Sequence, residues 1–248
     1  MTGLIAFFIL QCQPMNSKTL IIIPTYNEIE NIKKLISAIR EKVSGVSILV
    51  VDDNSPDGTG ALVEKLKADD LGIHLLSRAG KLGLGTAYIA GFKYALEHDF
   101  EYIFEMDADF SHDPCYLPDF LDAIKGADLV LGSRYVPGGG VENWPFYRKM
   151  ISIGGSLYSR TLLSVPYRDL TGGFKCFKRS TLEAIALDDV HSEGYSFQIE
   201  MTYRVHKKGL KIKEIPIVFK DRLEGKSKMS WTIFFEAIIR VWHIRWTI

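Results

Sequence analysis

The chain has 248 residues, of which 47% are hydrophobic and 24% are charged, and its formal net charge at pH 7 is zero. This composition is ordinary for a globular protein, so it excludes a disordered or collagen-like chain, and the lack of net positive charge argues against nucleic-acid binding. Three widely spaced cysteines, with no C-x-x-C pair, argue against a disulfide framework and against a zinc site.

The first 17 residues are predicted to be an extension before the folded domain. Residues 4–10 (LIAFFIL) are apolar, but a membrane span needs about 20 residues and a signal peptide needs basic residues before its apolar stretch. Met15 directly precedes a convincing strand, so a start at Met15 is the favoured interpretation. A lead-in that touches a membrane is the alternative.

Apolar strands then alternate with amphipathic helices. The strands are expected at residues 19–26, 46–55, 73–78, 102–109 and 127–135, and the helices at residues 28–43, 57–70, 85–99 and 116–124. Such alternation is typical of an α/β fold, with a mostly parallel sheet and helices on both of its faces.

The alternating pattern loosens after residue 136. An amphipathic helix is expected at 146–165, a strand at 211–220 and an aromatic-rich closing helix at 231–248. We therefore predict one domain over residues 18–230, followed by a C-terminal amphipathic helix over residues 231–248. No segment after the first strand is long and apolar enough to cross a membrane.

Charge is distributed unevenly along the chain. Residues 101–130 contain eight Asp or Glu and one Lys, whereas residues 201–248 contain eleven Lys or Arg and four Asp or Glu. An acidic centre can hold a divalent metal ion, and a basic tail can hold phosphate. The two regions together favour a substrate that carries phosphate.

Polar residues follow four of the predicted strands, at the edge where ligands bind to sheets of this kind. They are Tyr26 and Glu28 after the first strand, Asp53 after the second, Asp107 and Asp109 after the fourth, and Arg134 after the fifth.

Asp107 and Asp109 lie one residue apart in FEMDADFSHDP (residues 104–114). If the strand continued through them they would share a face, and two adjacent carboxylates repel unless a proton or a cation lies between them. A divalent metal is one explanation, and a solvated acidic turn is the other. Because four strand ends supply polar side chains, we favour the metal.

Other site motifs are missing from the sequence. The turn after the first strand, PTYNEIEN, has no glycine, which excludes the usual dinucleotide fingerprint. No G-x-S-x-G elbow occurs, and the six histidines show no metal-ligand spacing.

The chain resembles the dolichol-phosphate (polyprenol-phosphate) mannose synthases of glycosyltransferase family 2 from about residue 18 to residue 240. The resemblance rests on PTYNE, VVDDNSPDGT, GLGTAYIAGF, MDADFSHDP, GSRYVPGGGVENWPFYRK, DLTGGFKCFKR, GYSFQIEM and DRLEGKSKMS. It implies a GT-A fold and the transfer of mannose from GDP-mannose to a polyprenyl monophosphate, with Mg²⁺ or Mn²⁺.

The resemblance also implies roles for individual residues. The donor would be bound by Pro24, Tyr26, Glu28, Val51, Asp53, Asp107, Ala108, Asp109 and Arg134, with Asp107 and Asp109 as the metal ligands. In some relatives a Gln two residues after the second Asp also binds the metal, but this chain has Ser111 there.

The acceptor phosphate would be bound by Arg134, Arg148 and Lys228, and the catalytic groups would be Asp109, Arg134, Arg222 and Lys228. Three of the predicted residues could instead have a purely structural role. Glu28 can interact favourably with a helix dipole, Asp53 can form a turn, and Arg148 can be a charged residue on a helix surface.

The expected enzyme is peripheral, on the cytoplasmic side of a membrane. The helix around residues 148–163 and the closing helix, with Trp231, Phe234, Phe235, Trp242 and Trp246, are the candidates for the membrane surface. Core packing or a dimer contact is the alternative. Two other functions remain open: a transferase of the same family that uses UDP-glucose, and a non-catalytic subunit that binds nucleotide sugars.

Overall fold

The structure is a computed structural model that describes residues 15–220 and 231–248. Its main sheet has seven strands in the order β3-β2-β1-β4-β7-β5-β8. These are β1 (Thr19–Thr25), β2 (Ser47–Asp52), β3 (Ile73–Ser77), β4 (Tyr102–Glu105), β5 (Leu129–Ser133), β7 (Lys175–Lys178) and β8 (Ile212–Pro216). Only β7 runs antiparallel to its neighbours in this sheet. The predicted mostly parallel sheet is confirmed.

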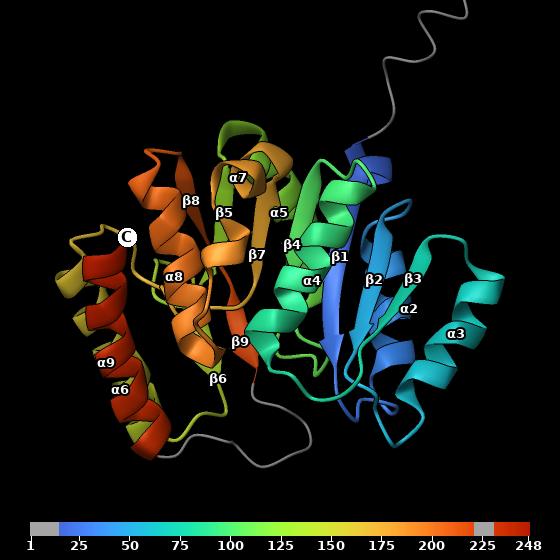
Figure 1. The fold of residues 1–248 in the computed structure, drawn as a ribbon, viewed down its shortest axis with the longest axis horizontal. Helices are drawn as coiled ribbons and strands as arrows, with labels where there is room; N and C mark the ends of the chain where they lie inside the picture. The colour runs from blue at the N-terminus through green and yellow to red at the C-terminus, as the bar shows by residue number, and fades with distance from the viewer. Residues whose placement is uncertain (1–14, 221–230) are drawn as a thin grey trace, which may run out of the picture.

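Helices cover both faces of this sheet (Figure 1). One face carries α2 (Ile32–Lys42), α3 (Thr59–Asp69) and α5 (Leu117–Ala123), and the other carries α4 (Leu84–Glu97), α7 (Arg179–Ala184) and α8 (Gly194–Lys207). Short 3₁₀ turns are η1 (Met15–Lys18), η2 (Pro114–Tyr116), η3 (Ile124–Gly126) and η4 (Leu187–Asp189).

Strand β1 shows why the sequence produces two cores. Ile21 and Ile23 pack with one layer of helices, and Leu20 and Ile22 pack with the other. Successive side chains of a strand point to opposite faces, so a strand buried on both faces needs a continuous apolar run.

Part of the chain after β5 lies outside the main sheet. Strands β6 (Gly140–Glu142) and β9 (Val218–Lys220) form a parallel pair, and α6 (Phe146–Leu163) lies beside α9 (Trp231–Thr247) at the left of Figure 1. Val241 and Ile244 of α9 are buried against Leu163 and Ile199. The division into an N-terminal extension, a domain and a closing helix stays a prediction.

Several elements differ from the sequence-based expectation. The strand expected at 211–220 breaks at Ile217 into β8 and β9, which pair in different sheets. Strand β7 and helix α8 were not predicted, because each contains buried polar residues, such as Lys175 and Gln198, that obscure the apolar pattern. The part of the chain that the structure describes contains no helix that is both long and apolar enough to cross a membrane.

Candidate active site

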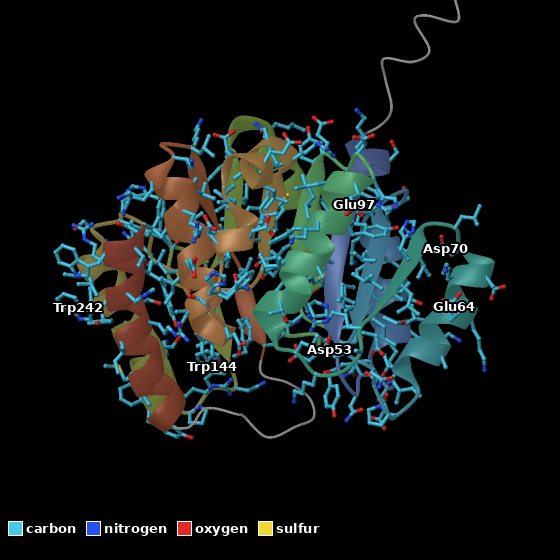
Figure 2. All side chains as sticks on the ribbon, viewed as in Figure 1. Asp53, Glu64, Asp70, Glu97, Trp144 and Trp242 are labelled. Atoms are coloured by element: carbon cyan, nitrogen blue, oxygen red, sulfur yellow. The ribbon has the colours of Figure 1, made fainter. Side chains whose placement is uncertain are left out.

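The carboxyl ends of the parallel strands lie at the lower edge of the sheet in Figure 1. Figure 2 labels Asp53 and Trp144 near this edge, whereas Glu97 lies toward the opposite edge. The polar residues that follow β1, β2, β4 and β5 therefore meet along one side of the molecule, as the sequence analysis expected.

The predicted base and ribose residues come from the ends of β1 and β2. Pro24 and Val51 lie directly opposite each other in the strand register. Tyr26 follows β1 with 37% of its surface exposed, and the ammonium of Lys81 lies 4.5 Å from the centre of its ring. The carboxylate of Glu28 accepts a hydrogen bond of 2.9 Å from Asn31. An exposed ring beside buried apolar residues is a surface on which a nucleobase can stack.

The turn that carries Tyr26 and Glu28 is tied to the loop after β2. The backbone N–H groups of residues 27–29 donate, in order, to side-chain oxygens of Ser55, Thr59 and Asp57. The helix expected from Glu28 begins only at Ile32, although the backbone N–H groups of Asn31 and Ile32 already donate to the carbonyl of Glu28. The turn is therefore held in place by a neighbouring loop before any ligand binds.

Asp53 is buried and already has protein partners. Its Oδ1 accepts from Nε of Arg78 at 2.5 Å, and its Oδ2 accepts from the backbone N–H of Leu82 at 3.2 Å. Arg78 also donates to Thr86 and to the carbonyl of Gly83. Arg78 was not predicted from the sequence, although its position directly after β3, on the same edge, could have indicated it. Asp53 thus holds the loop after β3 beside the residues that are predicted to bind the base and ribose.

The Asp107–Asp109 segment lies in a loop, because β4 ends at Glu105. Asp107 accepts a hydrogen bond of 3.1 Å from the hydroxyl of the buried Tyr88. Its backbone N–H donates to Nδ1 of His112 at 3.0 Å. Burial lowers the pKa of His112, although the nearby Asp107 and Asp109 oppose this, so the imidazole is neutral at pH 7. Asp107 is therefore held through both its side chain and its backbone.

Asp109 is oriented by Ser111. Its Oδ1 accepts from the backbone N–H of Ser111 at 3.1 Å and from the hydroxyl at 2.5 Å. Phe110, between them, adopts a positive φ of 61°, which makes this tight turn possible. The hydroxyl of Ser111 is thus used to support Asp109.

The residues of this loop fit a divalent cation. Tyr88 and Ser111 each hold one oxygen of a half-buried carboxylate, and such outer hydrogen bonds orient metal ligands. The described part of the chain contains no group of three or more His, Cys, Asp or Glu that could hold a metal by itself. Two carboxylates suit Mg²⁺ or Mn²⁺ when a diphosphate and water supply the remaining oxygens.

Arg134 follows β5 and forms a buried ion pair with Asp169. Its Nε and Nη2 donate to the two carboxylate oxygens at 2.7 Å each, and its backbone N–H donates to the same carboxylate at 3.0 Å. Burial alone would raise the pKa of Asp169 and lower the pKa of Arg134. The attraction between the two charges and the hydrogen bonds between them exceed this effect. The pKa of Asp169 is lowered and the pKa of Arg134 is raised, so the pair is ionised.

Aromatic rings surround the guanidinium group of Arg134. It lies 5.2 Å from the ring centre of Tyr135, 5.6 Å from that of Trp144 and 5.5 Å from that of Phe219. Arg148, from α6, lies 4.2 Å from the same Trp144 ring. The structure therefore brings Arg134 and Arg148 together, as the predicted acceptor site requires. Neither Asp169 nor the rings were predicted from the sequence, although Asp169 opens the DLTGG segment and Trp144 lies in VENWP.

Three buried polar residues lie behind the Asp107 loop. Glu105 is fully buried and has no hydrogen-bond partner within the described residues, and the ammonium of Lys175 donates to the backbone carbonyl of Gln198 at 2.7 Å. Burial raises the pKa of Glu105 to about 7 and lowers that of Lys175 to about 8. The cluster interacts with the loop electrostatically, because the charge of Asp107 further raises the pKa of Glu105 and that of Lys175 lowers it.

Arg222 and Lys228 lie outside the described residues. Their predicted roles at the diphosphate and at the acceptor phosphate therefore stay predictions, as do the predicted contacts of the side chains of Trp231, Phe234 and Phe235.

The chain is similar in sequence to known glycosyltransferases. Residues 20–186 match the family model described as glycosyl transferase family 2. The chain is 49% identical over 229 residues to the undecaprenyl-phosphate mannosyltransferase of Micrococcus luteus, covering 92% of this chain and 93% of that protein. It is 48% identical over 232 residues to the polyprenol monophosphomannose synthase of Mycolicibacterium smegmatis, covering 92% and 88%.

Among solved structures, glucosyl-3-phosphoglycerate synthase from Mycobacterium tuberculosis has a similar fold. Its complex with Mg²⁺ and UDP matches with a TM-score of 0.65 at 17% identity, covering 93% of this chain and 82% of that one. Its complex with Mn²⁺, UDP and glucosyl-3-phosphoglycerate matches with a TM-score of 0.63 at 17% identity, covering 94% and 84%. The predicted GT-A fold is confirmed.

Proposed function

Because the chain belongs to glycosyl transferase family 2, we propose that it transfers mannose from GDP-mannose to a polyprenyl monophosphate at a membrane surface, with inversion at the sugar carbon. The observation that carries this proposal is that the predicted donor and acceptor residues follow strands that end at the same edge of the sheet. There Asp107, Asp109 and Arg134 all lie close enough to His112 to influence its pKa, and Arg148 shares the Trp144 ring with Arg134. The names of the two bacterial relatives, at 49% and 48% identity over most of the chain, support the mannosyl and polyprenyl parts.

The donor would lie across the ends of β1, β2 and β4. Tyr26 offers its ring to the base, and Glu28 offers a carboxylate that can accept hydrogen bonds from ribose hydroxyls. Asp107 and Asp109 would hold Mg²⁺ or Mn²⁺, which neutralises the charge that develops on the departing nucleoside diphosphate. Ala108, which is buried between them, keeps the loop packed against the sheet.

The acceptor phosphate would lie against Arg134 and Arg148. A phosphate monoester carries a charge of roughly −1.5 to −2 at pH 7, so the nucleophile arrives ionised and needs no general base. The chain's own task is then to position the phosphate and to stabilise charge. A single in-line displacement by the phosphate oxygen inverts the sugar carbon and releases the nucleoside diphosphate.

Two exposed apolar stripes support a membrane contact. On α6, Phe146, Met150 and Leu157 are 78%, 51% and 57% exposed, and on α9, Ile239, Trp242 and Trp246 are 70%, 49% and 78% exposed. Residues spaced in this way share one face of a helix. Helices with such stripes and with basic residues bind at the interface of a bilayer. We propose that these stripes bring the site to an acceptor whose lipid tail stays in the bilayer.

Point substitutions test the membrane contact better than removal of residues 231–248, because that removal would also delete the buried Val241 and Ile244. We expect Trp242→Ser combined with Trp246→Ser to reduce co-sedimentation with anionic vesicles. It should also slow transfer to long polyprenyl phosphates more than to short, soluble ones. Leu71→Ser, at a position 92% exposed on another part of the surface, is the control. Unchanged sedimentation of the double variant would show that α9 is not the membrane contact.

The transfer reaction itself is tested with a panel of donors. The protein is incubated with GDP-mannose, UDP-glucose and other GDP- and UDP-sugars, together with a polyprenyl phosphate, and the lipid product is measured. We expect product with GDP-mannose that disappears when the divalent metal is chelated. Preference for UDP-glucose would support the alternative donor, and lack of product with every donor would support a non-catalytic binding subunit.

A further inference from the structure

We propose that Trp144 is a positioning residue that holds the guanidinium groups of Arg134 and Arg148 together as one phosphate-binding site. This inference rests on the proposed function, because it assigns that phosphate to the acceptor. Trp144 lies between β6 and α6, and no role for it followed from the sequence.

The geometry places two cations against one ring. The guanidinium carbon of Arg148 lies 4.2 Å from the centre of the Trp144 ring, and that of Arg134 lies 5.6 Å from it. Both distances are within the range of about 6 Å over which a cation is attracted to an aromatic face, and Trp is the strongest partner of this kind. Two guanidinium groups repel each other, and a shared ring opposes that repulsion.

The two arginines need such a link because they come from different elements. Arg134 is fixed at the end of β5 by its paired hydrogen bonds to Asp169. Arg148 lies in the first turn of α6, on the other side of the turn that contains Trp144. A long arginine side chain loses rotamer freedom when it binds a ligand, so a ring that already restricts it lowers the cost of binding phosphate.

The position of the ring is set by packing. The indole N–H of Trp144 is buried and has no hydrogen-bond partner among the described residues. Its ring instead contacts Phe219 edge-on, with centres 5.5 Å apart. Phe219 in turn contacts His112 at 5.8 Å, and His112 accepts the backbone hydrogen bond of Asp107. The ring thus lies between the candidate donor loop and the candidate acceptor cations.

The test compares Trp144→Leu, which removes the aromatic face, with Trp144→Phe, which keeps one. For a short, soluble polyprenyl phosphate, we expect Trp144→Leu to raise the acceptor KM about tenfold and Trp144→Phe to stay within about threefold of the unsubstituted protein. The dissociation constant for GDP-mannose with Mg²⁺, measured by calorimetry, should not change. Tyr94→Leu, which removes a ring stacked on His98, is the control and should change neither constant.

A double-mutant cycle tests whether Trp144 acts through Arg148. If it does, Trp144→Leu should add little to the loss in acceptor affinity that Arg148→Ala alone causes. Additive losses, equal losses for the Leu and Phe variants, or an acceptor KM for Trp144→Leu within twofold of the unsubstituted protein would each overturn the proposal.

Direct calorimetric binding of the same short polyprenyl phosphate separates this proposal from the proposed function. If the protein binds the phosphate without transferring sugar, the proposed function fails, while the dissociation constants of the two Trp144 variants still decide the role of the ring. If the unsubstituted protein does not bind this phosphate at all, the inference is wrong.

Discussion

The two halves of the candidate site are held by different kinds of contact. On the donor side, the turn after β1 is tied to the loop after β2 by three hydrogen bonds from backbone N–H groups to side chains. On the acceptor side, Arg134 depends on the buried carboxylate of Asp169, which is 35 residues away in sequence, on the hydroxyl of Thr171 and on surrounding rings.

This difference has a consequence for substitutions. Several modest hydrogen bonds share the support of the donor turn, so the loss of one leaves the others. The acceptor side has a buried charge whose partner cannot be removed without leaving it uncompensated. We therefore expect substitutions on the donor side to change function more than stability, and the Arg134–Asp169 pair to change both.

The largest effect on activity is expected from Asp109→Asn. An amide lacks the charge of a carboxylate and ligates a metal more weakly, so a loss of several kcal/mol of transition-state stabilisation, on the order of a thousandfold in rate, should follow. The unfolding midpoint in urea should barely change. Asp119→Asn, at an exposed position on α5, is the control. Normal turnover of Asp109→Asn with Mg²⁺ or Mn²⁺ would contradict the metal assignment.

Asp169→Asn is expected to cause the largest loss of stability. It leaves Arg134 charged and buried, and breaking such a pair costs about 3–5 kcal/mol. Asp188→Asn removes the partner of Lys93 at a site 83% exposed, where the cost should stay below about 1 kcal/mol. Urea denaturation of both variants measures the difference. Similar midpoints for the two variants would show that burial does not distinguish the pairs.

Glu105→Gln is expected to change how stability depends on pH. Burial raises the pKa of Glu105 from 4.5 to about 7, so the folded state binds this proton more tightly than the unfolded state does. Its contribution is present below pH 4.5 and is lost as the pH rises toward 7, by up to about 3 kcal/mol. The pKa of Lys175 is lowered to about 8, so its titration changes the free energy of unfolding only at pH values above those at which Glu105 titrates. Unfolding free energies between pH 5 and pH 7 should fall less in the Gln variant, and parallel curves would contradict the prediction.

The smallest effect is expected from Tyr88→Phe, which removes one hydrogen bond to Asp107 and keeps the ring stacked on Phe197. Removal of such outer support typically weakens metal affinity roughly tenfold. Titration with Mn²⁺ in the presence of GDP, without acceptor, would measure this loss. Tyr116→Phe, which removes a hydroxyl that accepts from the backbone of Val218, serves as the control. Equal Mn²⁺ affinities for the two variants would show that Tyr88 does not support the metal site.

Local patterns in the sequence were enough to predict the sheet of the first half and the edge where the site lies. Apolar runs such as residues 19–26 and the helical spacing between them are local patterns, and parallel strands must place their carboxyl ends together. Asp107, Asp109 and Arg134 could therefore be assigned to one edge before any contact was known.

The contacts that support these residues could not be predicted in this way, because they form between segments that are distant in sequence. Strand β7 inserts antiparallel between β4 and β5, and this brings the DLTGG segment that precedes it to Arg134. The burial of Lys175 opposite Glu105 and the meeting of Trp144 with two arginines are contacts between distant parts of the chain. No local period predicts them, because the free energy that stabilises each buried charge comes from a partner that folding alone brings near.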